Sequence, residues 1–266
     1  MNNISHKPPL DSESVKKYLQ RIGITEILHR DLNTLNKLII AHLTHIPFEA
    51  LDVWALGTCP SLEIKDLYEK IVDLKRGGYC FELNTLFRAL LNSLGFDAYQ
   101  VIASLLDEDG VAAPPAHNAI ICKINGIKYF VDVGFGGPVP LGAMELNDKP
   151  QLGFRLEKQE DKYHLIRIDS DKERPSILFR DMAAQPVEFI PLNFYVSQNR
   201  DIHFRNRIMV IQRQPDGRIF RLIGDTFSIT DSLGTETQPV NTTDDIRRIL
   251  EQYFHISPHT VTLREP

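Results

Sequence analysis

Residues 117–134 read HNAIICKINGIKYFVDVG, two apolar runs on either side of Asn125-Gly126. An Asn-Gly pair between such runs is the strongest short-range signal for a β-hairpin with a two-residue turn. The turn fixes the register of the two strands, so that Ile124 faces Ile127. This stretch therefore predicts an antiparallel sheet in the middle of the chain.

A histidine and an aspartate share one face of this hairpin. The same register puts Ala119 opposite Asp132, and because side chains alternate along a strand, His117 is a diagonal neighbour of Asp132. An aspartate is awkward in a strand unless something pairs with it. A carboxylate that holds one nitrogen of a histidine fixes its tautomer and leaves the other nitrogen free to take a proton. The pair therefore indicates a general base with its orienting carboxylate.

Upstream of the hairpin, apolar residues recur at helical spacing. Asp11 or Ser12 is a suitable cap for the first helix, and Asp31 for the second, which must end before Pro47. The third helix begins near Ser61 and is broken by the glycines of Arg76-Gly77-Gly78. Four helices are expected, within residues 11–23, 31–46, 61–75 and 80–95.

Cys80 directly follows the glycine break and falls in the first turn of the fourth predicted helix. A thiol at that position meets the positive end of the helix dipole, which favours the nucleophilic thiolate. Position alone is equally compatible with a small buried hydrophobic residue, the role we expect for Cys59 and Cys122. Together with His117 and Asp132, however, Cys80 completes the residue types of a catalytic triad. The long spacing of the three residues disfavours a zinc site.

Beyond Gly95 the apolar pattern changes to period two, which predicts a strand near 99–105 and further hairpins around Glu160-Asp161 and Pro215-Asp216-Gly217. A helical segment near 190–199 and an amphipathic C-terminal helix follow. This order favours an α+β protein over alternating βαβ units. Helices come first, strands follow and a mixed tail closes the chain, so these parts are expected to be segregated in the fold.

Composition excludes several classes of protein. The net charge of −5 is spread along the 266 residues, and no basic run interleaved with aromatics indicates nucleic-acid binding. The N-terminal residues lack the apolar core of a signal peptide, and no segment has the length of a membrane span, so a cytoplasmic protein is expected. Three cysteines without a CxxC pattern favour neither a disulfide framework nor a structural zinc site. The oligomeric state stays open.

Three motifs resemble those of the arylamine N-acetyltransferases: RGGYCFELN at 76–84, HIPFE at 45–49 and VDVGFGGP at 131–138, with a histidine opening the strand between them. The resemblance spans most of the chain. It implies three parts: a helical bundle carrying Cys80 at residues 1–96, a β-barrel carrying His117 and Asp132 at residues 97–190, and an α/β lid at residues 191–266. It also implies a role in xenobiotic metabolism. It also implies a ping-pong reaction in which Cys80 takes the acetyl group from acetyl-CoA, used as acyl-donor substrate without a metal, and an arylamine or hydrazine removes it.

In that resemblance His117 is the base and Asp132 its orienter, and the acceptor pocket is lined by Phe48, Phe81 and Phe135. Two positions depart from the family pattern. Ala50 stands where members often have asparagine after HIPFE, and Asn118 stands where a more apolar residue often follows the histidine. These departures leave the preference for particular amines open.

Two other functions remain as alternatives. A papain-like or transglutaminase-like hydrolase also uses a cysteine at a helix start, followed later by a histidine and a carboxylate or amide. A binding protein could keep the fold without the chemistry. Comparing the activity with acetyl-CoA and with a peptide substrate distinguishes the acetyltransferase from the hydrolase. The reactivity of Cys80 tests whether the protein is a binding protein without catalysis.

Overall fold

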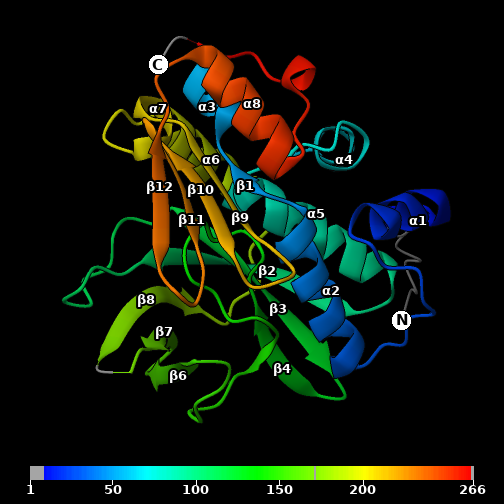
Figure 1. The fold of residues 1–266 in the computed structure, drawn as a ribbon. Coiled ribbons are helices and arrows are strands. Elements are labelled where there is room, and N and C mark those ends of the chain that lie inside the picture. Colours follow the sequence, from blue (N-terminus) through cyan, green and yellow to red (C-terminus); the bar gives the residue numbers. More distant parts are fainter. Residues whose placement is uncertain (1–8, 171, 265–266) are drawn as a thin grey trace.

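A computed structural model describes residues 9–170 and 172–264 of the chain (Figure 1). The predicted caps of the first two helices are confirmed: the side chains of Asp11 and Asp31 accept hydrogen bonds of 2.8 Å from the backbone N–H groups of Ser14 and Thr34. The helices of the N-terminal part are α1 (Ser12–Arg21), α2 (Leu32–His45), α3 (Leu51–Leu56), α4 (Ile64–Tyr68) and α5 (Cys80–Ser93).

The third predicted helix is shorter than its apolar pattern suggested. Helix α4 runs into a π-helical turn, η1 (Glu69–Asp73), which ends before the glycine break. The pattern did not predict α3, a short helix that follows the HIPFE segment and stops at Gly57 in the left-handed conformation. A single turn of either kind is too short to leave a periodic signal.

The central part of the chain forms one antiparallel sheet in the order β5-β4-β3-β2-β8-β7-β6. The predicted hairpin register is confirmed, with Ile124 opposite Ile127, and Asn125 and Gly126 both have the positive φ of a tight hairpin turn. The strands are β2 (Asp97–Leu105), β3 (His117–Ile124), β4 (Ile127–Val131), β5 (Met144–Glu145), β6 (Phe154–Gln159), β7 (Lys162–Ile168) and β8 (Glu173–Arg180).

This sheet curls around its own core. Met144 on one edge strand and Phe154 and Leu156 on the other belong to one buried cluster with Phe130 and Phe179 from the middle of the sheet. Within the described residues the two edges do not pair with each other, so the sheet is a half-barrel. The prediction of an α+β fold is confirmed, and the hairpins expected near residues 160 and 216 are present as β6–β7 and β9–β10.

The C-terminal part contributes a second antiparallel sheet, in the order β1-β9-β10-β11-β12. Its first strand comes from the N-terminal part, because Phe48 pairs with Ile211. The elements are β1 (Phe48–Glu49), α6 (Pro186–Gln198), α7 (His203–Asn206), β9 (Met209–Arg213), β10 (Ile219–Ile223), β11 (Thr226–Thr230), β12 (Thr235–Pro239), α8 (Thr243–Phe254) and η2 (Pro258–Thr260).

Helix α8 packs on one face of this second sheet, where Phe220, Leu222 and Phe227 meet Ile249 and Leu250 in a core that also includes residues of α3. The opposite face is turned toward α2 and the half-barrel (Figure 1). The division of the chain at residues 96 and 190 stays a prediction, since β1 and α3 from the first part pack with the third.

Helix α5 connects the parts of the molecule. Its buried face packs against β2 and β3 of the half-barrel, and residues from α1, α2 and α6 share its core. The first residue of this helix is Cys80. None of the helices in the described part of the chain has the length and apolar character needed to cross a bilayer; residues 1–8, on which the signal-peptide argument partly rests, lie outside the described residues.

Candidate active site

Cys80 lies where the helical part meets the half-barrel. It is the first residue of α5, with Tyr79 as extended cap, and the Glu82 carboxylate accepts a hydrogen bond of 3.1 Å from the Tyr79 backbone N–H. Cys80 is 4% exposed, and its Sγ lies 3.8 Å from the carbonyl oxygen of Ala116, the residue before β3. The thiol is therefore at the positive end of the α5 dipole and next to the start of the predicted histidine strand.

His117 and Asp132 form a close buried pair, as the hairpin register indicated. His117 Nε2 is 2.6 Å from Asp132 Oδ2, and the two residues are 2% and 3% exposed. Cys80 and His117 line the same cavity, and the neighbouring Cys80 thiol contributes to the raised pKa of the imidazole. Since Nε2 is engaged by the carboxylate, Nδ1 is the nitrogen left for the thiol. The structure thus brings together the three residues predicted from sequence.

The electrostatics of His117 follow from this geometry. Burial by itself would lower the pKa of the imidazole, but the charge of Asp132 and the hydrogen bonds to Asp132 and Cys80 raise the pKa to about 10. At neutral pH the imidazole therefore carries a proton, and the site favours an imidazolium beside the sulfur. Such a pairing is the arrangement that makes a cysteine nucleophilic.

Asn84, one helical turn after Cys80, holds the Asp132 carboxylate in place. Its Nδ2 donates to Asp132 Oδ1 at 2.9 Å and to the Asn118 carbonyl at 2.7 Å, and its Oδ1 accepts from the Val133 N–H at 3.0 Å. Asn84 is fully buried. Asn84 belongs to the motif at residues 76–84, but the sequence did not predict this role; the signal for it is a polar side chain on the apolar stripe of α5.

Gly134 is required by the close approach of the strand to the helix. Its N–H donates to Asp132 Oδ1 at 2.8 Å. A Cβ at this position would lie 2.7 Å from Asn84 Nδ2 and 2.9 Å from the Cys80 Cα atom, closer than side chains pack. The absence of a side chain at Gly134 therefore lets this backbone pack directly against α5, the helix that begins with Cys80.

Buried charges fix the segment that precedes Cys80. Arg76 donates from Nε to Glu49 Oε1 and from Nη2 to Asp52 Oδ1, each at 2.9 Å. Lys70 Nζ lies 2.7 Å from both Glu82 Oε1 and Asp52 Oδ2. Burial opposes the charge on Arg76, but the carboxylates of Glu49 and Asp52 outweigh it and raise the pKa of the guanidinium. The glycine break is thus tied to the HIPFE segment, a connection that the sequence did not predict.

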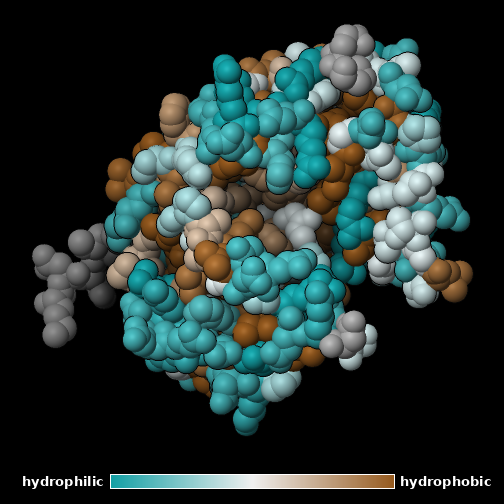
Figure 2. Space-filling model, turned by 90° about the vertical axis from the view of Figure 1, so that its left-hand side faces the viewer, coloured by the Kyte–Doolittle hydropathy of each residue, from teal (hydrophilic) through white to brown (hydrophobic). Residues whose placement is uncertain are grey.

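A cavity of about 580 Å³ opens beside the three residues, within the usual range for small-molecule sites. Cys80 and His117 line it together with Phe48 and Phe135, two of the three aromatic residues predicted for the acceptor pocket. The His117 and Phe135 rings meet edge to face at 5.5 Å. Figure 2 shows one face of the molecule hollowed between two hydrophilic regions, with hydrophobic residues inside the hollow.

The structure places Phe81 elsewhere. Its side chain is fully buried, packs against Tyr79 and Phe189, and does not line the cavity. The physical reason is the helical turn: adjacent residues on a helix point in directions about 100° apart, so Phe81 cannot face the same space as Cys80. A residue missed from sequence, Phe204 of α7, lines the cavity and contacts the Phe48 ring at 5.9 Å.

The two departures from the family pattern are both buried. Ala50 is 2% exposed and donates its N–H to the Met209 carbonyl at 3.2 Å. Asn118 is fully buried in β3, where its carbonyl accepts from Asn84, and it does not line the cavity. Among the described residues, no group of three or more histidine, cysteine or acidic side chains could hold a metal ion.

Comparison with known proteins identifies the family. A family model described as N-acetyltransferase matches residues 31–261. The arylamine N-acetyltransferase of Mycolicibacterium smegmatis is 30% identical over 229 residues, which cover 82% of this chain and 83% of that protein. The chain belongs to the arylamine N-acetyltransferase family.

Solved structures of this family have the same fold. The M. smegmatis arylamine N-acetyltransferase superposes with a TM-score of 0.85 at 28% identity, covering 93% of each chain. The Mycobacterium marinum arylamine N-acetyltransferase in complex with CoA gives a TM-score of 0.83 at 26% identity, covering 91% of this chain and 92% of that one. The resemblance drawn from the motifs is confirmed, and this arylamine N-acetyltransferase family member is an acetyl-transferring enzyme.

Family membership decides between the enzyme classes that the residue order left open. The order of cysteine, histidine and aspartate is shared with papain-like hydrolases, but the matched family transfers acetyl groups. It also disfavours a binding protein that has lost its chemistry.

Proposed function

We propose that this enzyme transfers an acetyl group from acetyl-CoA to an arylamine or hydrazine by a ping-pong reaction through an acetyl-Cys80 intermediate. One observation carries the proposal: Cys80 at the α5 N-terminus and His117, whose imidazole is bonded to the buried Asp132, line a single small-molecule cavity. The M. marinum relative was solved with CoA bound, which supports CoA as the carrier of the acyl group.

The first half-reaction starts from the thiolate–imidazolium pair, in which the proton of the Cys80 thiol resides on His117, and the Cys80 thiolate attacks the thioester carbonyl carbon of acetyl-CoA. A bond forms between that carbon and Sγ of Cys80, and the bond to the CoA sulfur breaks. The departing CoA thiolate takes the proton from His117, so CoA leaves as a thiol. Asp132 stays ionised throughout and stabilises the imidazolium while it exists.

In the second half-reaction the acceptor nitrogen attacks the carbonyl carbon of acetyl-Cys80. The new bond is carbon to nitrogen, and the bond from carbon to Sγ breaks. His117, neutral after the first half, accepts the proton that the nitrogen loses, and the thiolate–imidazolium pair is restored. Phe48 and Phe135 offer the aromatic surface against which a flat acceptor ring would pack.

The burial of Cys80 and His117 favours transfer of the acetyl group to an amine over its hydrolysis by water. Cys80 and His117 are nearly inaccessible except through the cavity. An acceptor ring that fills the cavity displaces water from the thioester. A cytoplasmic location, a role in xenobiotic metabolism and the three-part division of the chain remain predictions.

The test is the intact mass of purified enzyme after mixing with acetyl-CoA without acceptor. Wild type should gain one acetyl group and lose it when an arylamine is added, whereas Cys80→Ala should gain none. Cys59→Ala is the matched control, since Cys59 is an exposed thiol, and it should be acetylated like wild type. Absence of an adduct on wild type, or an adduct that persists in Cys80→Ala, would refute the covalent mechanism.

A further inference from the structure

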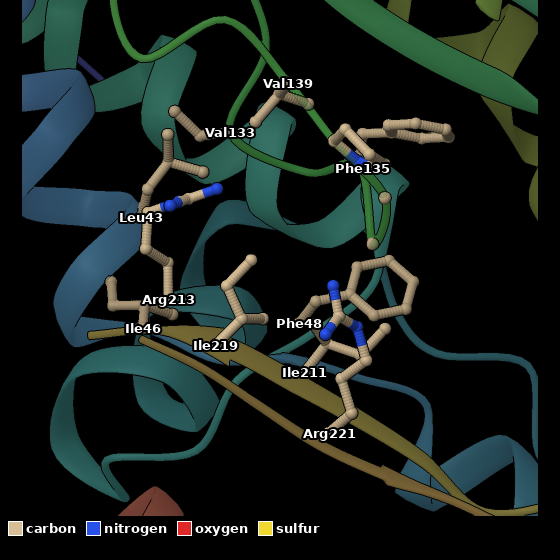
Figure 3. A pocket seen from close by; sticks show the side chains of 13 residues that line it. Leu43, Ile46, Phe48, Val133, Phe135, Val139, Ile211, Arg213, Ile219 and Arg221 are labelled. Atoms are coloured by element: carbon tan, nitrogen blue, oxygen red, sulfur yellow. The ribbon is translucent and has the colours of Figure 1, made fainter. Parts of the chain in front are cut away.

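Two arginines of the second sheet, one in the wall of the active-site cavity and one in the recess beside it, have no carboxylate partner among the described residues. Arg221 on β10 lines the cavity that contains Cys80, and Arg213 on β9 lines the adjoining recess, to which Arg221 also contributes (Figure 3). The strand register pairs Arg221 with Ile211 and Arg213 with Ile219, so the four side chains share one face.

Neither guanidinium is neutralised within the described residues. The guanidinium of Arg213 forms no ion pair or hydrogen bond within the described residues. The guanidinium of Arg221 donates from Nη1 to Thr230 Oγ1 at 3.1 Å and forms no ion pair there. Asp201, which also lines the cavity, is not within ion-pair distance of either. Burial lowers the pKa of both arginines, and the charge of Arg213 lowers the pKa of Arg221 further.

Two partly desolvated guanidinium groups that repel each other have a high electrostatic energy unless an anion lies between or beside them. Arginine stays protonated in proteins, so deprotonation does not relieve the repulsion. Neighbouring hydroxyl groups on the same face, Ser228 opposite Arg221 and Thr230 opposite Ile219, add hydrogen-bonding capacity without negative charge. This face is therefore suited to bind a carboxylate or a similar anion.

Contacts connect this anion-binding face to the triad through aromatic surface. The Phe135 ring meets His117, the backbone of Gly136 lies against the Phe48 ring, and Phe48 pairs with Ile211, the neighbour of Arg221. In Figure 3 the Arg221 guanidinium points from the sheet toward the loop that carries Phe135, beside Phe48. A flat ring held by Phe48 and Phe135 would thus have the nucleophile on one side and Arg221 on the other.

We propose that Arg221, assisted by Arg213, forms an anion subsite that selects acceptors carrying a carboxylate or sulfonate on the aromatic ring, on the side away from the reacting nitrogen. This inference rests on the proposed function, since the acceptor must discharge acetyl-Cys80. The phosphates of CoA are the other source of negative charge. They are separated from the reacting sulfur by the whole pantetheine arm, whereas Arg221 lines the same cavity as Cys80.

The test compares 4-aminobenzoate with the neutral 4-aminobenzamide, measured as kcat/KM for the acceptor at saturating acetyl-CoA. Wild type should prefer the benzoate. Arg221→Gln should lose about 10- to 100-fold with the benzoate, the range typical of a hydrogen bond to a charged group, and keep its activity with the benzamide. Arg221→Lys should recover part of the loss, and Arg213→Gln should show a smaller loss with the same selectivity.

Arg218→Gln is the matched control, because Arg218 lies in the same hairpin but is exposed and paired with Asp216 at 2.7 Å; its preference should equal that of wild type. Equal losses with both acceptors in Arg221→Gln would overturn the subsite. So would slower acetylation by acetyl-CoA with unchanged acetylation by S-acetylpantetheine, which would assign Arg221 to the CoA phosphates. Failure of the covalent mechanism is distinguishable, since no acetyl-enzyme would then form with wild type.

Discussion

Asn84 offers the sharpest test of how the triad is positioned. Its side chain joins α5 to the strand that ends in Asp132, through bonds to the Asp132 carboxylate, the Asn118 carbonyl and the Val133 N–H. Asn84→Ala removes all three bonds without touching a reacting atom. The Asp132 carboxylate keeps the N–H of Gly134 at 2.8 Å but is free to turn away from His117.

The expected loss of stability in Asn84→Ala follows from the buried groups that lose their hydrogen-bond partner. Two buried backbone groups lose a partner, at about 1–3 kcal/mol each, so the free energy of unfolding should fall by about 2–6 kcal/mol. At about 2–4 °C per kcal/mol, the melting temperature should fall by roughly 4–24 °C. A displaced orienting carboxylate should slow thiol chemistry by about 10- to 100-fold, as small misplacements in active sites do.

The assay is the second-order rate of Cys80 alkylation by iodoacetamide at pH 7, far below the melting temperature, together with the melting curve. Asn92→Ala is the control: Asn92 lies on the same helix and accepts one hydrogen bond, 3.1 Å from the Ala98 N–H, at the end away from Cys80. It should lose about 1 kcal/mol and no reactivity. If Asn84→Ala melts earlier but alkylates as fast as Asn92→Ala, Asn84 is structural and the positioning argument fails.

Three further perturbations test the site. Because the pKa of His117 is raised to about 10, alkylation of wild type should vary little between about pH 6.5 and 8.5, while alkylation of His117→Ala should become faster as the pH rises. A flat profile in the variant would contradict the pairing. Because the folded-state pKa of His117 is raised to about 10, the stabilisation that protonated His117 gives is full below about pH 6.5 and is lost as pH rises through 10. In urea unfolding, the free energy of unfolding of wild type should therefore decline over this range, and that of His117→Ala should not. Gly134→Ala should destabilise by about 1–3 kcal/mol through overpacking and abolish acetylation, whereas Gly126→Ala, where a Cβ meets nothing within 4 Å, should still be acetylated. Phe135→Ala should raise KM for aromatic acceptors and leave acetyl-enzyme formation intact. Phe81→Ala should chiefly lower the melting temperature, through the loss of about 3–5 kcal/mol that is typical of a buried phenylalanine. The reverse pattern would show that Phe81, and not Phe135, contacts the acceptor.

The parts of the site that sequence could predict are local. Asn125 and Gly126 impose the hairpin turn, and the turn fixes which residues of β3 and β4 face each other, so the His117–Asp132 pair follows from a few adjacent residues. The start of α5 is equally local, because the glycine break before Cys80 interrupts one helical pattern and the next begins at once.

The parts that sequence could not predict depend on how distant elements dock. Nothing in one chain's pattern shows that α5 packs against β3, yet that packing brings Cys80 to His117. The pairing of Phe48 with Ile211 joins segments 163 residues apart, and two-residue strands such as β1 have no periodic signal. Phe81 was placed in the pocket by its position in a motif, but the geometry of a helix turns it into the core.

The buried charges around Arg76 give a physical reason why the HIPFE and RGGYC segments belong to one site. Glu49 follows Phe48 of the cavity wall, and Arg76 lies four residues before Cys80. Buried ion pairs contribute little net stability over apolar packing, but removing one partner leaves an uncompensated charge, so such a network tolerates few other arrangements. With Lys70 bound to Glu82 inside α5, the same network reaches the helix that starts at Cys80. This network of charges therefore sets the separation between Cys80 and Phe48, and its residues do not line the cavity. The residues that do line the cavity remain free to vary with the amine.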